Sequence, residues 1–193
     1  MTLHQTLTSR HVTLQPLSDV HREGLRTACD ADTETWQAFY PYSMAGEHFD
    51  GAWARAMADQ ARGETLFFAV MVGGEVIGQT AYITPNIHNR SVEIGATYYH
   101  PAARGGAVNP AAKRLLLGHA FDLGLDRLWF KVDAINNRSR AAVLKLGAVF
   151  EGIHRHERVT WTGRVRDTAF YSILADEWPA VRERLDQRLT QFE

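Results

Sequence analysis

Apolar positions recur along the chain with two different periods, which predict alternating strands and helices. Alternating or continuous β-prone apolar runs predict strands at residues 11–17, 65–72, 76–83, 92–99, 125–132, 149–161 and 164–174. Apolar residues three or four positions apart predict one helix that begins at residue 18 and others at residues 47–62, 109–121, 136–146 and 177–189. Residues 31–46 form a mixed segment, rich in aromatic side chains and interrupted by Pro41.

The order of these elements predicts the fold class. Three strands follow one another as a meander, with Gly73-Gly74 as its first turn, and strands and helices then alternate. Such an order implies a mixed α/β sheet, antiparallel at first and parallel across the central helix. We therefore expect a single domain over residues 1–193, with roughly seven strands and about four to five helices.

Residues 91–121 join the two halves of this sheet. Simple alternation along the strand places Val92, Ile94, Ala96 and Tyr98 on one face and Glu93, Gly95, Thr97 and Tyr99 on the other. A glycine-containing turn follows, and Asn109 is expected to cap the next helix, with Pro110 at its first position.

This strand, glycine turn and helix together suggest a phosphate site. Free backbone N–H groups converge where such a turn enters a helix, and the helix dipole adds partial positive charge. Arg104, Lys113 and Arg114 would add full charges. An ordinary strand-to-helix connection that binds nothing is the alternative.

Composition narrows the classes of protein. The chain has 21 Lys and Arg against 22 Asp and Glu, so its charge gives no general drive toward nucleic acid or an anionic membrane. No apolar run approaches the roughly 20 residues that span a bilayer, and the first ten residues lack the apolar core of a signal peptide. Cys29, the single cysteine, cannot form an internal disulfide, and the histidines show no metal spacing beyond the pair His154 and His156. We expect a cytoplasmic protein without a metal.

Four segments carry a resemblance to a known family. They are the hairpin 67–82 with Val76-Ile77-Gly78; Glu93-Ile94-Gly95 with the glycine turn and a helix ending His119-Ala120-Phe121; Asn136-Asn137-Arg138-Ser139 with Leu146-Gly147-Ala148 and Glu151-Gly152; and Gly163-Arg164-Val165-Arg166-Asp167 with Phe170-Tyr171-Ser172-Ile173. In this order they resemble the GCN5-related N-acetyltransferases, in the branch of the ribosomal-protein alanine acetyltransferases. The resemblance extends from residue 11 to about residue 181.

The resemblance implies an N-acetyltransferase that uses acetyl-CoA, in a sheet whose two central parallel strands splay apart. Pantetheine would lie between residues 92–99 and 128–133, and the pyrophosphate on the turn 104–109. The cofactor-binding residues that the resemblance implies are Ile94, Gly95, Ala96, Thr97, Arg104, Gly105, Gly106, Ala107, Val108, Asn109, Lys113, Asn136 and Ser139.

The phosphate loop departs from the family pattern Q/R-x-x-G-x-G/A. Gly106 matches it, whereas Ala103 and Val108 stand where a polar residue and a small residue are usual. Arg104 beside the turn, with Asn109 and Lys113 on the helix, would supply the missing polar contacts.

Acetyl transfer to an amine requires a proton acceptor, donors for the carbonyl oxygen and a donor for the leaving thiolate. Backbone amides near Ala96 and Thr97 would serve the oxygen. The family's usual tyrosine falls on Val143, so the resemblance assigns the thiolate to Ser139. The alternative is that Ser139 only caps the helix 140–146.

Glu93 is the leading candidate for the base, because it lies on the strand beside the expected thioester. Its alternative is a structural pairing with an arginine such as Arg90, and Glu151, His154 or a water chain are further candidates. On the acceptor side, the resemblance implies substrate contacts by Trp36, Tyr40 and Arg166. A structural pairing of Arg166 with Asp167 is the alternative there.

The expected acceptor is a primary amine on a peptide N-terminus or a small molecule, with no nucleic acid or membrane involved. A non-catalytic acetyl-CoA-binding regulatory module is the main alternative. A nucleotide-binding protein is a weaker one, because no G-K-[ST] follows the glycine turn. Analogy with the family also suggests a homodimer.

Overall fold

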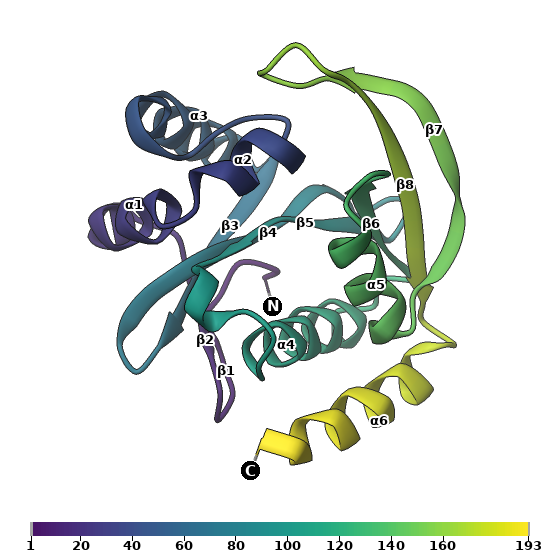
Figure 1. Ribbon diagram of the computed structural model, residues 1–193. Coiled ribbons are helices and arrows are strands. Elements are labelled where there is room, and N and C mark those ends of the chain that lie inside the picture. Colours follow the sequence, from purple (N-terminus) through teal and green to yellow (C-terminus); the bar gives the residue numbers. More distant parts are fainter. Residues whose placement is uncertain (1, 193) are drawn as a thin grey trace.

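One mixed sheet of eight strands organises residues 2–192, the part of the chain that the computed structural model describes (Figure 1). The strands are β1 (Leu7–Thr8), β2 (Thr13–Pro16), β3 (Thr65–Val72), β4 (Glu75–Asn86), β5 (Ser91–Tyr99), β6 (Arg127–Asp133), β7 (Val149–Val159) and β8 (Val165–Leu174). Their order across the sheet is β1-β2-β3-β4-β5-β6-β8-β7. The predicted mixed α/β fold is confirmed. The eighth strand is the two-residue β1, which the sequence did not predict and which pairs with β2. The strand predicted at residues 11–17 is shortened to β2.

The same residues include six α-helices. They are α1 (Arg22–Asp30), α2 (Thr33–Phe39), α3 (Phe49–Ala61), α4 (Val108–Asp122), α5 (Asn137–Leu146) and α6 (Trp178–Leu189). Helix α2 lies in the segment that the sequence left as mixed, and Asp32 caps it by accepting a hydrogen bond from the Thr35 amide at 3.0 Å. Helix α4 begins at Val108, one residue before the predicted cap, so Pro110 lies within its first turn, where a missing N–H is tolerated.

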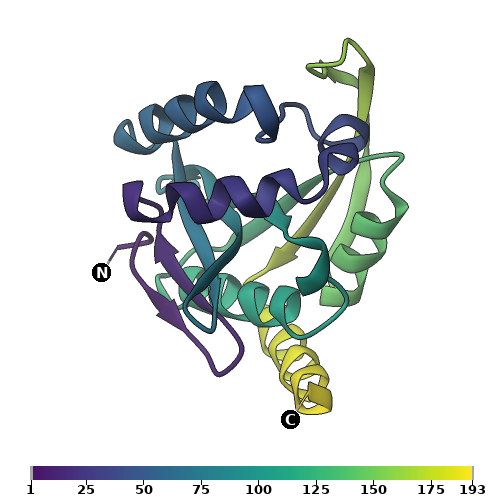
Figure 2. The same ribbon diagram turned by 60° about the vertical axis from the view of Figure 1, so that its left-hand side comes forward.

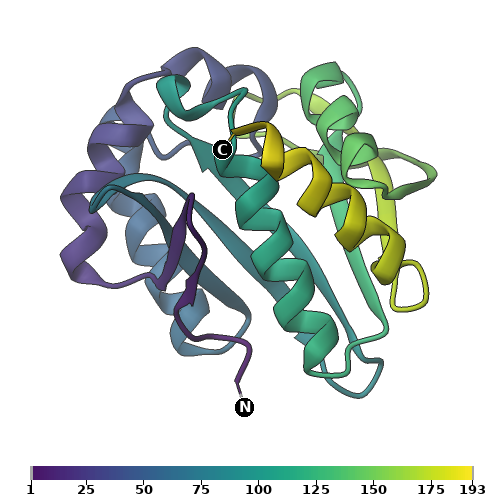
Figure 3. The ribbon, with the colours of Figure 1, turned by 90° about the horizontal axis from the view of Figure 1, so that it is seen from below.

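The helices cover the two faces of the sheet and give the protein two apolar cores. Helices α4, α5 and α6 contribute to the core that contains Val92, Ile94 and Tyr99. Helices α1, α2 and α3 contribute to the other, which contains Trp36 and Tyr98. Figure 2 shows α1 and α3 on their side of the sheet, and Figure 3 shows α4 and α6 side by side on the opposite face.

A β-bulge in β5 reverses the predicted alternation of its side chains. Gln79 pairs with Tyr98 but Ala81 pairs with Gly95, so β5 has one extra residue over this interval. Ala96 has φ +48, which lies in the left-handed region. Beyond this point the predicted faces are wrong: Tyr98 packs in the core with Trp36, and Tyr99 packs with Val92 and Ile94.

Strands β5 and β6 splay apart, as expected. Their parallel pairing is confined to three positions, from Ser91 opposite Arg127 to Glu93 opposite Trp129. Beyond these positions β5 continues along β4, and β6 continues along β8. The backbone edges that β5 and β6 turn toward each other therefore have no strand partner among the described residues, and a wedge opens in the middle of the sheet.

The long β7–β8 hairpin closes one side of this wedge. It curves away from the sheet in Figure 1, and its tip reaches the segment that contains α2. The Trp161 amide donates to the Pro41 carbonyl at 3.2 Å, and the Trp161 indole N–H donates to the Trp36 carbonyl at 3.3 Å. Thus α2 and the hairpin tip hold each other in place.

Candidate active site

A cavity of about 540 Å³ occupies the opening between β5 and β6. Its walls come from these two strands and from α2, α3, α4 and α5. The predicted site residues that line it are Tyr40, Glu93, Ile94, Gly95, Ala96, Thr97, Arg104, Gly105, Asn109, Lys113, Asn136, Ser139 and Arg166. The structure thus brings most of the predicted site together in one place.

The turn before α4 presents unoccupied backbone donors. Gly105 has φ +82, and the chain then passes directly into the first turn of the helix. Within residues 2–192, the backbone amides of residues 105–109 donate no hydrogen bond. Three of the predicted site residues in this range, Gly106, Ala107 and Val108, do not line the cavity. Converging free amides at a helix N-terminus suit a phosphate.

Arg104 does not point freely at this turn. Its Nε donates to the Tyr99 carbonyl at 2.9 Å, its guanidinium pairs with Asp32, and it lies over the Tyr98 ring at 5.3 Å from the centroid. Burial alone would raise the pKa of Asp32, but hydrogen bonds from Thr35 and Arg104 outweigh this effect and lower it. Arg104 therefore joins the turn to the cap of α2, and backbone amides dominate the turn itself.

Lys113 of α4 is buried against β4 and β5. Its Nζ donates to Thr97 Oγ1 at 2.7 Å and to Thr80 Oγ1 at 3.2 Å, and the two hydroxyls are 2.8 Å apart. These partners are neutral, so burial lowers the pKa of Lys113 to about 7. Lys113 consequently changes charge near neutral pH at the wall of the cavity.

Ser139 and Asn136 lie at the start of α5. Asn136 caps this helix by accepting a hydrogen bond from the Ser139 amide at 3.0 Å. The alternative in which Ser139 is the cap is therefore wrong, and within the described chain its hydroxyl has no hydrogen-bond partner. Val143, one turn later, is buried and also lines the cavity, but it offers no donor. Ser139 is thus the hydroxyl on this wall that is available to a ligand.

Glu93 is buried at the start of the splay, with 7% of its surface exposed. Burial raises the pKa of Glu93, although the Lys131 amine, 3.8 Å from the carboxylate, opposes this effect. The proposed pairing with Arg90 is wrong, because Arg90 pairs with Asp126 instead. A buried carboxylate with a raised pKa beside an open cavity is a suitable proton acceptor.

The other candidate bases lie elsewhere. Glu151 forms an ion pair with Arg127 and accepts a hydrogen bond from Ser172 at 2.8 Å. His154 stacks on Phe170, with the ring centroids 3.9 Å apart, and does not line the cavity.

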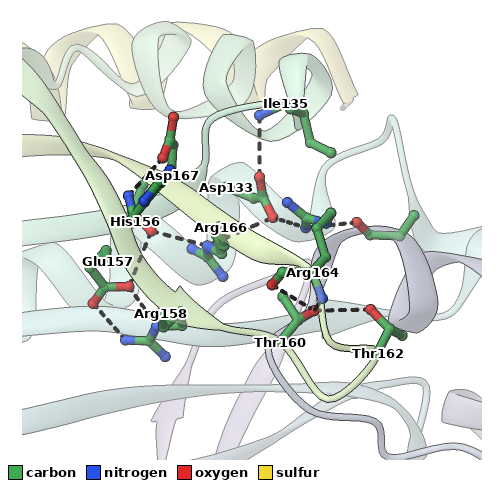
Figure 4. Close-up of polar contacts among 12 residues, drawn as sticks. Asp133, Ile135, His156, Glu157, Arg158, Thr160, Thr162, Arg164, Arg166 and Asp167 are labelled. Carbon is green, nitrogen blue, oxygen red and sulfur yellow. Dashed lines mark hydrogen bonds and ion pairs between the residues drawn. The ribbon is translucent and has the colours of Figure 1, made fainter.

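A polar network from β6, β7 and β8 borders the cavity (Figure 4). Asp133 pairs with Arg164 and lies 3.7 Å from Arg166. The expected pairing of Arg166 with Asp167 is wrong, because these neighbours point to opposite faces of β8 and Asp167 accepts the His156 amide at 2.7 Å.

Glu157 forms the second part of this network. It accepts hydrogen bonds from the Arg158 Nε at 2.6 Å and from Thr168 at 3.2 Å, and it lies 3.5 Å from Lys131. The hydrogen bonds from Arg158 lower the pKa of Glu157 to about 2. Glu157 is therefore a fixed negative charge, in contrast to Glu93.

The aromatic segment forms the wall opposite this network. Trp36 is fully buried between Tyr40 and Tyr98, at centroid distances of 4.3 Å and 4.5 Å. Tyr40 lines the cavity, and its hydroxyl donates to the Thr97 carbonyl next to the β5 bulge. Trp36 thus lies behind the cavity surface, in a position that supports the wall, whereas Tyr40 is on the surface.

Several residues of the cavity wall were not predicted from the sequence. Tyr42, Arg55, Lys131 and Arg158 line the cavity, although none lies in a recognised motif. The aromatic character of residues 36–42 was the signal for Tyr42, and the alternation of β6 could have placed Lys131 beside Glu93. Arg55 carries no comparable signal, because an exposed arginine on an amphipathic helix is ordinary.

Comparisons with known proteins identify the class. The splayed sheet, its cavity and the donor-rich turn are the architecture of an acyltransferase, and the family model "Acetyltransferase (GNAT) domain" matches residues 11–149. The chain belongs to this family of GNAT N-acetyltransferases, which use acetyl-CoA. No curated protein matches the chain with significance.

Solved structures agree with this assignment. The chain is similar to a GCN5-related N-acetyltransferase from Brucella melitensis, with 29% identity, a TM-score of 0.88, and coverage of 96% of this chain and 86% of that one. It shares its fold with Mycobacterium smegmatis RimJ in complex with CoA-disulfide, with 24% identity, a TM-score of 0.79, and coverage of 92% and 88%. The ribosomal L7/L12 acetyltransferase RimL also shares the fold, with 16% identity, a TM-score of 0.79, and coverage of 88% and 94%.

Residues 2–192 contain neither a membrane-spanning helix nor a cluster of metal-ligating side chains. No described helix has the length and apolar character needed to cross a membrane. The same residues contain no group of three or more His, Cys, Asp or Glu side chains arranged to hold a metal ion.

Proposed function

We propose that the protein transfers the acetyl group of acetyl-CoA directly to a primary amine while both substrates are bound between β5 and β6. The observation that carries this proposal is the splay itself, because it places unpaired strand edges, Glu93 and Ser139 around a single cavity. Holding two reactants in one geometry removes much of the entropic barrier to their reaction.

The residues present fit CoA. The free amides of residues 105–109 suit its pyrophosphate, and the open edges of β5 and β6 suit the amides of its pantetheine arm. The amide nitrogen of Asn136 is free for a further contact, because Asn136 uses only its Oδ1 to cap α5. Lys113 and Asn109 line the same end of the cavity. The departures from the family's phosphate loop are thus offset by backbone donors, which do not depend on side-chain identity.

In this proposal, Glu93 accepts the proton that the acceptor ammonium must lose before its nitrogen can attack. A carboxylate whose pKa is raised toward neutrality is a better proton acceptor than an ordinary exposed one. Backbone amides near the β5 bulge donate to the carbonyl oxygen as negative charge develops on it. The nitrogen attacks the thioester carbonyl carbon, the C–S bond breaks, and Ser139 donates its hydroxyl hydrogen to the departing thiolate. The second proton lost by the nitrogen restores the Ser139 hydroxyl, so that free CoA and an N-acetylated product leave.

The acceptor is a peptide N-terminus or a small amine. Residues of α2, α3, β7 and β8 line the cavity in addition to those near the phosphate turn, and this part of the wall is available to an acceptor. Such a wall of aromatic and cationic side chains can hold either kind of acceptor, and RimL illustrates a protein acceptor within the same fold.

The test combines calorimetry with an enzymatic readout. Acetyl-CoA and CoA are titrated into the protein, and a panel of amines and short peptides is then offered while free thiol is measured. Binding together with thiol release on at least one amine, reduced in Ser139→Ala, is the expected result. Binding without release across the panel favours the regulatory module, and absence of CoA binding refutes the proposal.

We also propose a homodimer in which the edge strand β7 takes part. Val149, Phe150 and Ile153 lie on this strand with about half of their surface exposed, and β7 has no partner on its outer side among the described residues. Sedimentation analysis of the wild type and of Phe150→Lys tests this proposal: a dimer that dissociates in the variant is expected, and a wild-type monomer refutes it.

A further inference from the structure

One end of the cavity combines cationic groups that the CoA site does not require. Thr65, Ile83 and Glu93 line this end, and the register across β3, β4 and β5 places them opposite one another. The phosphate turn follows the other end of β5, roughly 20 Å away over the six residues from Glu93 to Tyr99. Cations near Glu93 are therefore out of reach of the pyrophosphate.

Arg55 is the first of these cations. It lies exposed on α3, which packs on β3, and its side chain lines the cavity. Asp59, one helical turn later, pairs with Arg62 and leaves Arg55 without an ion-pair partner in the described chain. The wall of the cavity thus presents a guanidinium that no protein carboxylate neutralises.

Tyr42 and Arg158 lie near Arg55. All three side chains line the same cavity. Burial raises the pKa of Tyr42, and the positive charges of Arg55 and Arg158 oppose this effect. No hydrogen bond of the Tyr42 hydroxyl occurs within residues 2–192, and the raised pKa of Tyr42 means that it keeps a hydrogen to donate. Arg158 uses Nε and one terminal nitrogen on Glu157, which leaves the other terminal nitrogen unoccupied.

The charges around the cavity are unbalanced in the same sense. Seven cationic side chains line it against three carboxylates. Arg104, Lys113 and Arg138 come from the elements that flank the CoA end, and Arg166 lies beside Asp133. Lys131 and Arg158 lie near Glu93 but also pair with Glu157, so at this end Arg55 is the lining cation that no carboxylate pairs with in the described chain.

We propose that Arg55, Arg158 and Tyr42 bind a carboxylate carried by the amine acceptor. This inference rests on the proposed acetyl transfer and names the class of acceptor. The planar guanidinium of Arg55 can hold a carboxylate through two parallel hydrogen bonds, and Tyr42 donates a third. Glu93, which lines the same end of the cavity, then accepts the ammonium end of the same molecule. The carboxylate comes either from an acidic side chain near a peptide N-terminus or from a small amino acid.

The experiment compares acceptors that differ only in this charge. Peptides that begin Ser-Glu and Ser-Gln test the first source, and glutamate with its carboxamide analogues tests the second. For wild type we expect kcat/KM to be at least about tenfold higher for the charged member of one pair, as one charged hydrogen-bonding contact implies. In Arg55→Ala the preference is expected to disappear, and Arg55→Lys should restore part of it.

Arg182→Ala is the matched control. Arg182 is exposed on α6, outside the cavity wall, and its substitution removes the same charge. Because alanine is a better helix former than arginine at an exposed helical position, neither alanine variant should fail to fold. The control is expected to keep the wild-type preference for the charged acceptor.

A binding measurement separates this inference from the proposed function. The N-acetylated Ser-Glu peptide is titrated into the CoA complex of wild type and of Arg55→Ala, without any need for turnover. The inference is supported if wild type binds the Ser-Glu product more tightly than the Ser-Gln product and Arg55→Ala does not. The N-acetylated forms of glutamate and its carboxamide analogues are titrated in the same way. Equal binding within both pairs, or a preference that survives in Arg55→Ala, overturns the inference. A lack of turnover with every amine counts against the proposed function alone.

Discussion

Removing the buried amine of Lys113 is expected to stabilise the protein in a pH-dependent way. In Lys113→Met a flexible apolar side chain of similar length replaces the amine. Thr80 and Thr97 remain 2.8 Å apart and continue to hydrogen-bond each other, so no hydroxyl is left without a partner. The substitution therefore isolates the effect of burying an ionisable group.

The magnitude follows from the two pKa values of the lysine. Burial lowers the pKa from 10.5 to about 7, so the unfolded chain binds this proton more tightly than the folded protein does. The cost of burial is fully present below pH 7, where it is about 5 kcal/mol, and it is relieved as pH rises toward 10.5. Between pH 6 and pH 9 the stability advantage of Lys113→Met over wild type should shrink by about 3 kcal/mol.

Urea denaturation followed by tryptophan fluorescence at several pH values between 6 and 9 measures this change. Comparing the variant with wild type at each pH cancels the contributions of all other ionisable groups, including Cys29. Lys145→Met, at an exposed position of α5, controls for the loss of a surface charge. A difference in unfolding free energy that stays constant over this range would refute the reasoning from burial.

Three further predictions concern the site and its frame. Ser139→Ala should lower kcat by roughly 100-fold with little change in the Kd for acetyl-CoA, as measured by single-turnover kinetics and calorimetry. Gly78→Ala should lower the free energy of unfolding by about 3 kcal/mol or more, because its Cβ would lie 2.0 Å from a β5 carbonyl oxygen. Gly51→Ala in α3 meets nothing within 4 Å and should raise the free energy of unfolding by up to about 1 kcal/mol, and thermal melts compare the two variants. Tyr40→Phe should cost about 1–3 kcal/mol in denaturant-induced unfolding, because it leaves a β5 carbonyl without its donor.

The order of the elements was predictable because periodicity and turn residues act locally. Gly73 and Gly74 both have positive φ in the first hairpin turn, and Gly147 takes the left-handed conformation that ends α5. Each signal lies within a few residues of the feature that it specifies. The same holds for Asn136, whose capping role follows from its place before a helical pattern.

The faces of β5 were not predictable in the same way. Ala96 takes a left-handed φ although alanine has no preference for it, because the surrounding sheet fixes the bulge: Gln79 donates to the Ala96 carbonyl at 3.3 Å. A single extra residue then exchanges the faces of every later side chain in the strand. Local alternation cannot reveal this change, because the cause lies on the neighbouring strand β4.

Charged partners were missed for a related reason. Arg90 lies in the turn before β5 and pairs with Asp126, whereas Lys131 of β6 lies across the splay from Glu93. The partner of a buried charge is set by which strands are neighbours, and this is a property of topology. The sequence therefore indicated Glu93 as a candidate site residue but did not indicate its partner.

The bulge also gives β5 the two arrangements that the proposed binding of two substrates requires. Without it, the side chains of Thr97 and Glu93 would share one face, and Lys113 would have no hydroxyl partner on β5. With it, Thr97 turns toward α4 at the phosphate end, while Glu93 keeps its place on the opposite face beside Lys131. If Lys113 meets a phosphate there, CoA binding must raise its pKa and take up a proton near pH 8. Calorimetry in two buffers of different ionisation enthalpy detects that uptake, which Lys113→Met should abolish; a heat of binding that does not depend on the buffer would mean that Lys113 only braces the bulge.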